Sequence, residues 1–239
     1  MTHTLGCDTN HWEGRVDSVA MKASGIKFNI PKMTDFIANT TTGFQDSEFQ
    51  NTYQGHKEQS LPIGGYHWLQ PGVDPTVQAR YYLDRYSSYD LDITPVLDFE
   101  DPKFTSPTDY LWRAQVWLNV VEKETGKIPI IYTGYGFMGN FEKEKVGWMA
   151  RYPLWLAQYT VLQAPPRVPY PWDNWTFWQF TASGDGREYG ITGKAIDLDY
   201  FNGSPDDLYK FLGGKWAVKP TLYKRVMRYL SGDKLKQVQ

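Results

Sequence analysis

Short apolar runs alternate with amphipathic segments along most of the chain. The runs are typical of buried strands, and the pattern predicts eight of them, at residues 5–8, 27–32, 61–68, 93–98, 127–134, 153–157, 175–180 and 193–199. The clearest helical pattern runs from Ser106 to Gly126, with apolar residues at spacings of three and four. Further helices are expected to begin at Asp46 and Asp74, and a last one is expected over 204–212. Strands that alternate with helices predict parallel βα units and an α/β fold of the closed, TIM-like (β/α) barrel type.

Two stretches depart from the regular alternation. Residues 161–173 contain four prolines and no helical pattern. Pro31 lies inside the second predicted strand and counts against a fully paired central position. We therefore expect an irregular barrel with some helices missing. An open doubly wound sheet is the alternative, although no glycine-rich phosphate loop follows the first strand.

Carboxylates follow the apolar runs at three predicted strand ends. Asp8 ends the first strand, Asp98 and Glu100 end the fourth, and Asp197 and Asp199 end the eighth. In an extended strand, Asp98 and Glu100 share one face, about 7 Å apart. A buried carboxylate destabilises a protein by several kcal/mol unless it is paired. An active site can use it, because an acid with a raised pKa donates a proton beside one that stays ionised.

In a (β/α) barrel the active site lies at the mouth formed by the carboxyl ends of the strands. The first and last strands are neighbours in a closed barrel, so we expect Asp8 to lie near Asp197, with the fourth strand across the mouth. Other strand ends carry polar or aromatic side chains, namely Lys32, Tyr66, Trp68, Tyr132, Trp155 and Gln179. Acids ringed by aromatic side chains are typical of glycoside hydrolases, whose aromatic rings stack on sugars. A divalent-metal site, structural ion pairs and non-catalytic sugar binding remain open at this point.

Composition narrows the class of protein. No window approaches 18 uninterrupted apolar residues, so no membrane span is predicted. The single cysteine, Cys7, rules out an internal disulfide, and the spacing of the four histidines does not predict a zinc site. The N-terminus lacks the pattern of a secretory signal. Metal ions, cofactors and nucleic acid are not expected.

Charge is unevenly distributed along the chain. Residues 215–239 hold seven basic residues and one acid, a net +6, whereas residues 1–214 hold 18 basic and 26 acidic residues, a net −8. We expect a barrel over residues 1–213 and a basic tail over 214–239, in which Leu222, Val226 and Tyr229 share one helical face. The tail is a candidate for binding anionic polymers or a partner chain, and the alternative is that it packs on the barrel or is solvated.

Several short motifs occur in an order that is similar to one known family. They are Gly6-Cys7-Asp8-Thr9-Asn10, Gly65-Tyr66-His67-Trp68, Leu97-Asp98-Phe99-Glu100, Tyr132-Thr133, Trp155-Leu156-Ala157-Gln158-Tyr159, Trp178-Gln179 and Ile196-Asp197-Leu198-Asp199. The ordered set, which extends from about residue 4 to 212, resembles glycoside hydrolase family 25. These are the Chalaropsis-type lysozymes, common among bacteriophage endolysins.

The resemblance implies a flattened, incomplete (β/α) barrel that cleaves peptidoglycan. The bond is the β-1,4 linkage between N-acetylmuramic acid and N-acetylglucosamine. By the same resemblance, Glu100 is the general acid, Asp98 orients or stabilises the 2-acetamido group or the cationic intermediate, and Asp8 and Asp197 complete an acidic floor. Asp197 is preferred to Asp199 because the family's acid is the first of that pair. A non-catalytic peptidoglycan-binding module and a chitinase-like hydrolase are the alternatives.

The resemblance also sets expectations for partners and location. Bacterial peptidoglycan is the expected partner, with anionic cell-wall polymers as candidates for the basic tail. The expected location is the host cytoplasm with release to the cell wall, as for phage enzymes, or secretion by another route.

Overall fold

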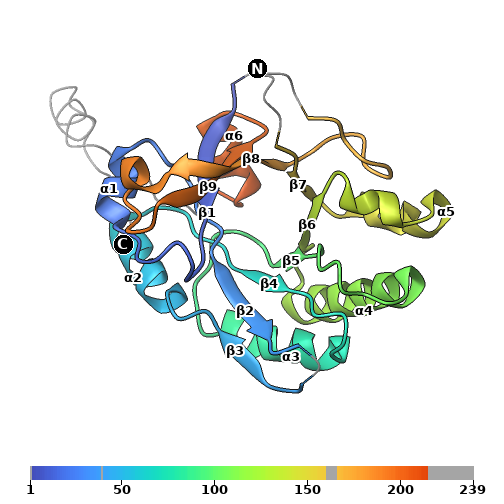
Figure 1. The fold of residues 1–239 in the computed structure, drawn as a ribbon. Helices are drawn as coiled ribbons and strands as arrows, with labels where there is room; N and C mark the ends of the chain where they lie inside the picture. Colours follow the sequence, from blue (N-terminus) through green and yellow to red (C-terminus); the bar gives the residue numbers. More distant parts are fainter. Residues whose placement is uncertain (1, 39, 160–165, 215–239) are drawn as a thin grey trace, which may run out of the picture.

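A curled sheet of nine strands forms the centre of the molecule (Figure 1). The computed structural model describes residues 2–38, 40–159 and 166–214. The strands are β1 Thr4–Asp8, β2 Lys32–Phe36, β3 Gly43–Gln45, β4 Tyr66–Trp68, β5 Val96–Asp98, β6 Ile130–Gly134, β7 Leu154–Ala157, β8 Phe177–Asp185 and β9 Ala195–Phe201. Their order across the sheet is β1-β9-β8-β7-β6-β5-β4-β2-β3.

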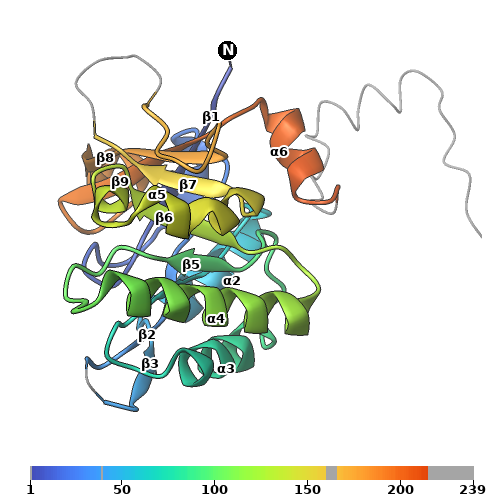
Figure 2. The ribbon, with the colours of Figure 1, turned by 90° about the vertical axis from the view of Figure 1, so that its right-hand side faces the viewer.

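Helices cover the outside of this sheet. They are α1 Ser18–Ala23, α2 Phe49–Gln59, α3 Pro75–Tyr86, α4 Pro107–Thr125, α5 Lys143–Val146 and α6 Pro205–Phe211, with 3-10 turns η1 Phe137–Asn140, η2 Gly147–Arg151 and η3 Gly186–Tyr189. Helices α3 and α4 lie side by side on the outer surface (Figures 1 and 2). The described part of the segment between β7 and β8 contains no helix, so the predicted irregular barrel with missing helices is confirmed there.

The long helix α4 illustrates how the local sequence determines where a helix begins and ends. The Ser106 side chain accepts a hydrogen bond from the backbone N–H of Asp109, and Pro107 occupies the first turn, where no N–H is needed. Gly126 ends the helix with a φ of 65°, which favours glycine. The apolar face buries Trp117 and Leu118 in the core, so the predicted helix is confirmed.

The middle of the sheet is parallel, as the βα pattern predicts. Strands β2, β4, β5, β6, β7 and β8 pair in parallel in that order. Their carboxyl ends therefore meet at one edge. The interior below that edge is filled by apolar side chains, including Phe28, Val96 and Phe177.

The last strands depart from the prediction. Strands β8 and β9 form an antiparallel hairpin, and β9 also pairs antiparallel with β1. Asp197 therefore lies near the beginning of its strand, and the prediction that it ends a strand is wrong. Because β9 runs against β1, its beginning lies at the same edge as the end of β1, and Asp197 still comes opposite Asp8.

The barrel closes irregularly. Among the described residues, Asn29 links β1 to the segment before β4 through two isolated parallel bridges. One joins Asn29 to Cys7 and the other joins Asn29 to Ile63. The predicted strand over 27–32 is confirmed only in part. Its backbone forms hydrogen bonds with β1 and with residues 62–66, but only Asn29 forms bridges there, and the regular strand β2 begins after Pro31, at Lys32. The predicted strand over 61–68 is likewise reduced to Tyr66–Trp68.

Three smaller predictions have mixed outcomes. Helix α2 begins after Glu48, so Asp46 is not its cap, although Asp46 Oδ1 accepts a hydrogen bond from the N–H of Glu48 at 2.9 Å. The helices predicted at Asp74 and over 204–212 are confirmed as α3 and α6.

The basic tail, residues 215–239, lies outside the described residues. Within the described ranges, no helix is both long enough and apolar enough to cross a bilayer.

Candidate active site

A pocket of about 120 Å³ opens at the edge where the parallel strands end. Asn10 and nine of the ten predicted site residues line it: Asp8, Tyr66, Trp68, Asp98, Glu100, Tyr132, Trp155, Gln179 and Asp197. The structure thus brings together side chains from β1, β4, β5, β6, β7, β8 and β9. Lys32 is not among the lining residues.

One wall of the pocket carries Asp98 and Glu100. Asp98 ends β5 and is 4% exposed, and its Oδ1 has no hydrogen-bond partner among the described residues. Burial, followed by the charge of Glu100, raises the pKa of Asp98 well above its usual value. Burial and the nearby Asp197 raise the pKa of Glu100 to about 7. Glu100 therefore holds a proton that it can donate near neutral pH.

The opposite wall is organised by Gln179. Its Nε2 donates to Asp8 Oδ2 at 2.7 Å and to Asp197 Oδ2 at 3.2 Å. Its Oε1 accepts from the hydroxyl groups of Tyr132 at 2.8 Å and Tyr159 at 2.7 Å. Both protons and both lone pairs of the amide are used, so the network fixes which way the amide points.

Burial also raises the pKa values of the two acids on this wall. Burial raises the pKa of Asp197 to about 6. The pKa of Asp8 is raised well above its usual value by burial and then by Asp199. Several carboxyl groups in one small hollow cannot all ionise without repulsion, so the pocket retains protons at a pH where an exposed acid has lost them.

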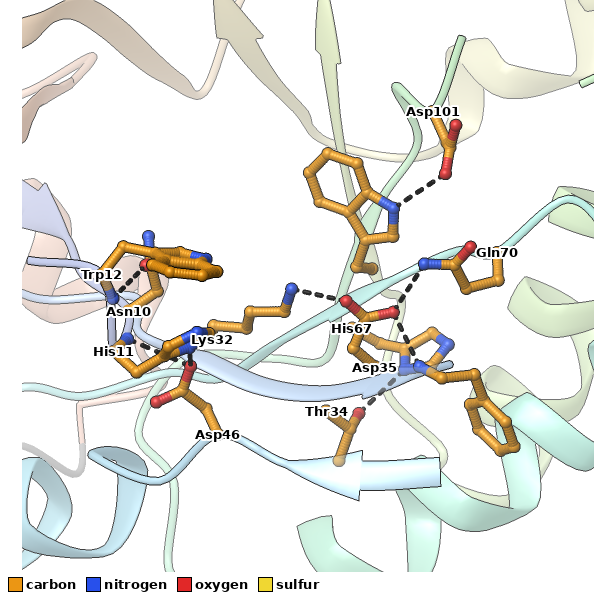
Figure 3. Close-up of polar contacts among 12 residues, drawn as sticks. Asn10, His11, Trp12, Lys32, Thr34, Asp35, Asp46, His67, Gln70 and Asp101 are labelled. Atoms are coloured by element: carbon orange, nitrogen blue, oxygen red, sulfur yellow. Dashed lines mark hydrogen bonds and ion pairs between the residues drawn. The ribbon is translucent and has the colours of Figure 1, made fainter. Parts of the chain in front are cut away.

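Lys32 does not line the pocket and forms an ion pair with Asp35. Its ammonium group lies 2.6 Å from Asp35 Oδ2 and 5.2 Å from the centre of the Trp68 ring, and Figure 3 shows it pointing to Asp35. The Trp68 indole N–H donates to Asp101 at 3.3 Å. The Lys32 charge also lowers the pKa values of Asp98 and Glu100, in opposition to burial. Direct binding of substrate by Lys32 stays a prediction.

Sequence reasoning did not select three residues that belong to this site. Asn10 lines the pocket, Tyr159 donates to Gln179, and Glu13 Oε2 accepts from the N–H of Asn10 at 2.7 Å. Burial and the charge of Asp197 raise the pKa of Glu13 to about 8. Asn10 and Tyr159 lie within the motifs that follow strand ends, and that position is the signal that could have identified them. Glu13 gave no comparable signal, because its burial depends on how the loop after β1 folds.

The loop after β1 is firmly held at the rim. His11 Nδ1 lies 2.7 Å from Asp46 Oδ2, and the N–H of His11 donates to the same oxygen at 3.1 Å (Figure 3). Asn10 Oδ1 accepts from the N–H of Trp12, a residue that is 84% exposed. In the described ranges, no group of three or more His, Cys, Asp or Glu residues is placed to hold a metal ion.

Comparisons with known proteins agree with this geometry. The model of "Glycosyl hydrolases family 25" matches residues 7–189. The uncharacterized protein YegX of Escherichia coli K12 is 34% identical over 217 residues, which cover 87% of this chain and 73% of YegX. Lysozyme M1 of Streptomyces globisporus is 28% identical over 209 residues, covering 83% of this chain and 68% of that protein.

Solved structures give the same result. A bacterial lysozyme from Streptomyces coelicolor superposes with a TM-score of 0.74 at 25% identity, over 90% of this chain and 99% of that one. A muramidase from Trichobolus zukalii superposes with a TM-score of 0.71 at 28% identity, over 89% and 100% of the two chains. The distorted barrel is therefore the fold of these lysozymes, and the chain belongs to glycosyl hydrolases family 25 and is a glycoside hydrolase.

Proposed function

We propose that this chain is an N-acetylmuramidase of bacterial peptidoglycan. It hydrolyses the β-1,4 bond between N-acetylmuramic acid and N-acetylglucosamine. The observation that carries the proposal is Glu100, a carboxyl group with a pKa of about 7 that lines a pocket with three other acids. The relatives named lysozyme or muramidase support the substrate class.

In this mechanism Glu100 donates its proton to the oxygen of the leaving sugar. The departing bond leaves positive charge on the ring carbon and ring oxygen, which nearby carboxylates stabilise. Asp98 is placed to orient the 2-acetamido group or to stabilise this charge, because one of its oxygens is buried without a partner. Asp8 and Asp197 line the other side of the pocket, where Gln179 donates a hydrogen bond to each of them.

Aromatic side chains around the acids suit a sugar ring. Tyr66, Trp68, Tyr132 and Trp155 line the same pocket. Their apolar faces can pack on the C–H side of a pyranose, while the polar groups bind its hydroxyl and amide groups. The pocket therefore offers both the contacts and the proton that hydrolysis needs.

The decisive experiment identifies the products. Mass spectrometry of digested peptidoglycan should find N-acetylmuramic acid at the new reducing ends. Glu100→Gln keeps the shape of the side chain but has no proton to donate at this position, and we expect its turnover to fall by about a thousandfold. Glu122→Gln, on α4 where Glu122 pairs with Arg151, is the matched control and should keep wild-type turnover.

Each alternative has its own outcome. A non-catalytic sugar-binding module would sediment with peptidoglycan without releasing reducing sugars. A chitinase-like hydrolase would cleave chitin and leave peptidoglycan intact. Either result would overturn the proposal, as would full activity of Glu100→Gln.

A further inference from the structure

An exposed tryptophan lies in the loop between β1 and α1, at the rim of the pocket. Trp12 is 84% exposed, more than any other large apolar or aromatic residue in the described ranges. It follows Asn10, which lines the pocket, by two residues. A single exposed apolar side chain is common on protein surfaces, so exposure alone carries no conclusion. What distinguishes Trp12 is the loop that holds it.

The backbone of this loop is fixed by two overlapping turns. The N–H of Glu13 donates to the carbonyl of Asn10 at 3.1 Å. The N–H of Gly14 donates to the carbonyl of His11 at 3.2 Å. Side chains close the same turn, because the N–H of Trp12 donates to Asn10 Oδ1 at 2.9 Å and the N–H of Asn10 donates to Glu13 Oε2 at 2.7 Å. The loop is therefore ordered although Trp12 remains largely in solvent.

The Trp12 ring packs against His11. The two ring centroids are 4.4 Å apart, and the ring planes are tilted by 40°. His11 is held by Asp46, which is 3% exposed and whose Oδ2 lies 2.7 Å from Nδ1 and accepts from the backbone N–H at 3.1 Å (Figure 3). A buried group thus anchors the neighbour of an exposed ring. A large aromatic ring on a rigid support loses little conformational freedom when a ligand binds.

A sugar is the ligand that suits this ring at this place. The flat apolar face of an indole can pack on the C–H side of a pyranose. The pocket of about 120 Å³ is small for a polymer, so a bound glycan strand has to continue over the rim. Asn10 connects the two places, because it lines the pocket and its Oδ1 accepts from the N–H of Trp12. This continuity with the pocket favours the substrate over a protein partner.

We propose that Trp12 is a sugar-binding residue outside the pocket, where its ring stacks on an N-acetylhexosamine beyond the two that the cleaved bond joins. This inference rests on the proposed muramidase function and adds a second contact for the same glycan strand. The contact lies away from the reacting atoms, so it strengthens substrate binding without changing the chemical step. The enzyme should therefore prefer long glycan strands to short fragments.

Kinetics on glycans of two lengths test this preference. For Trp12→Ala, KM on long, peptide-free glycan strands should rise by about tenfold while kcat changes by less than about twofold. On fragments too short to reach the rim, the rise in KM should be clearly smaller. Trp12→Phe keeps an aromatic face and should recover part of the affinity.

A second exposed tryptophan provides the matched control. Trp112 on α4 is 51% exposed and does not line the pocket. Trp112→Ala should leave KM unchanged for both glycan lengths. Trp12→Ala should keep the wild-type Tm, because the ring that it removes is exposed. A wild-type KM of Trp12→Ala on long strands would overturn the proposal, and so would equal losses on long and short glycans or a clearly lower Tm.

Calorimetry measures the contact without turnover. Glu100→Gln should bind the long, peptide-free strands, and adding Trp12→Ala should weaken that binding by about tenfold, whereas adding Trp112→Ala should not. If wild type releases no sugar but this difference is found, the muramidase proposal fails and the sugar contact of Trp12 stands. If wild type cleaves peptidoglycan and the difference is absent, only the contact is rejected. No binding by Glu100→Gln would reject the contact as well.

Discussion

Two groups of buried polar side chains lie within this barrel, and they differ in how completely their hydrogen bonds are formed. The first is the acidic pocket, where Asp98 Oδ1 has no donor among the described residues. The second consists of two buried histidines, His56 and His67, whose ring nitrogens all have partners.

His67 shows the second situation most clearly. Gln78 Nε2 donates to the carbonyl groups of Gln70 and Val73, so Gln78 Oε1 must be the acceptor for His67 Nε2 at 3.1 Å. His67 Nδ1 then accepts from the Thr34 hydroxyl at 2.8 Å. Burial lowers the pKa of His67 to about 4, so the ring is neutral and fully hydrogen-bonded at neutral pH.

The difference separates polar groups that hold the fold from polar groups left available for a substrate. A completed buried network stabilises one arrangement, whereas an incomplete one is unfavourable until a ligand completes it. Substitutions in the two groups should therefore have opposite effects. Loss of an acid should reduce activity and spare stability, and loss of a histidine should do the reverse.

The largest expected effect is on the activity of Asp98→Asn. The amide keeps the shape of the side chain but removes the charge that faces the substrate, so turnover on peptidoglycan should fall by about 100-fold to 1,000-fold. Urea unfolding should find the variant at least as stable as wild type, because a buried carboxyl group with an unpartnered oxygen has been removed. A clear loss of stability would mean that the acid supports the fold, and the contrast would fail.

A smaller effect is expected from His67→Leu. The substitution leaves the Thr34 hydroxyl without its partner, whereas Gln78 Oε1 keeps the hydrogen bond from the N–H of Gln70. One unsatisfied buried group costs about 1–3 kcal/mol, so the free energy of unfolding should fall by about 2 kcal/mol. Turnover per folded molecule should stay near wild type. Urea unfolding and active-site titration measure the two quantities separately. A stable variant with low turnover would place His67 in the catalytic group instead.

Much of this arrangement could be predicted from the sequence because it depends on local pattern. Asp98 and Glu100 follow an apolar run, and their spacing of two places them on one face of an extended segment. The helix from Ser106 to Gly126 has a cap, an apolar face and a glycine stop within the segment itself. These features need no knowledge of the rest of the chain.

Features that depend on distant pairing could not be predicted in the same way. The antiparallel return of β9 changes the position of Asp197 within its strand, although both arrangements place it near Asp8. Lys32 was expected in the pocket, but Asp35, three residues later, holds its ammonium group outside the lining. The burial of Glu13 is set by the contacts of the loop after β1, and periodicity carries no information on such a loop.

The smallest expected effect is on how the free energy of unfolding changes with pH. The pocket acids make it fall as pH rises, and the buried histidines make it fall as pH decreases. The folded state binds protons more tightly than the unfolded state at a carboxyl whose pKa is raised, so the free energy of unfolding falls as pH rises through that folded pKa. For Glu100, with a pKa of about 7, this loss between pH 6.5 and 8 amounts to about 1 kcal/mol. Glu100→Gln should flatten that decline, and Glu122→Gln should retain it.

The two buried histidines affect stability at acidic pH. The pKa values of His56 and His67 are lowered to about 4, so the unfolded chain binds more protons than the folded one between about pH 4 and 6.5, and stability falls as pH falls through this range. His67→Leu should weaken that acid-side loss and leave the decline above pH 6.5 unchanged. Urea unfolding of both variants and of wild type between pH 4 and 8 measures the two slopes. A decline above pH 6.5 that persists in Glu100→Gln would assign it to other acids, with Glu13, whose pKa is raised to about 8, as the next to replace.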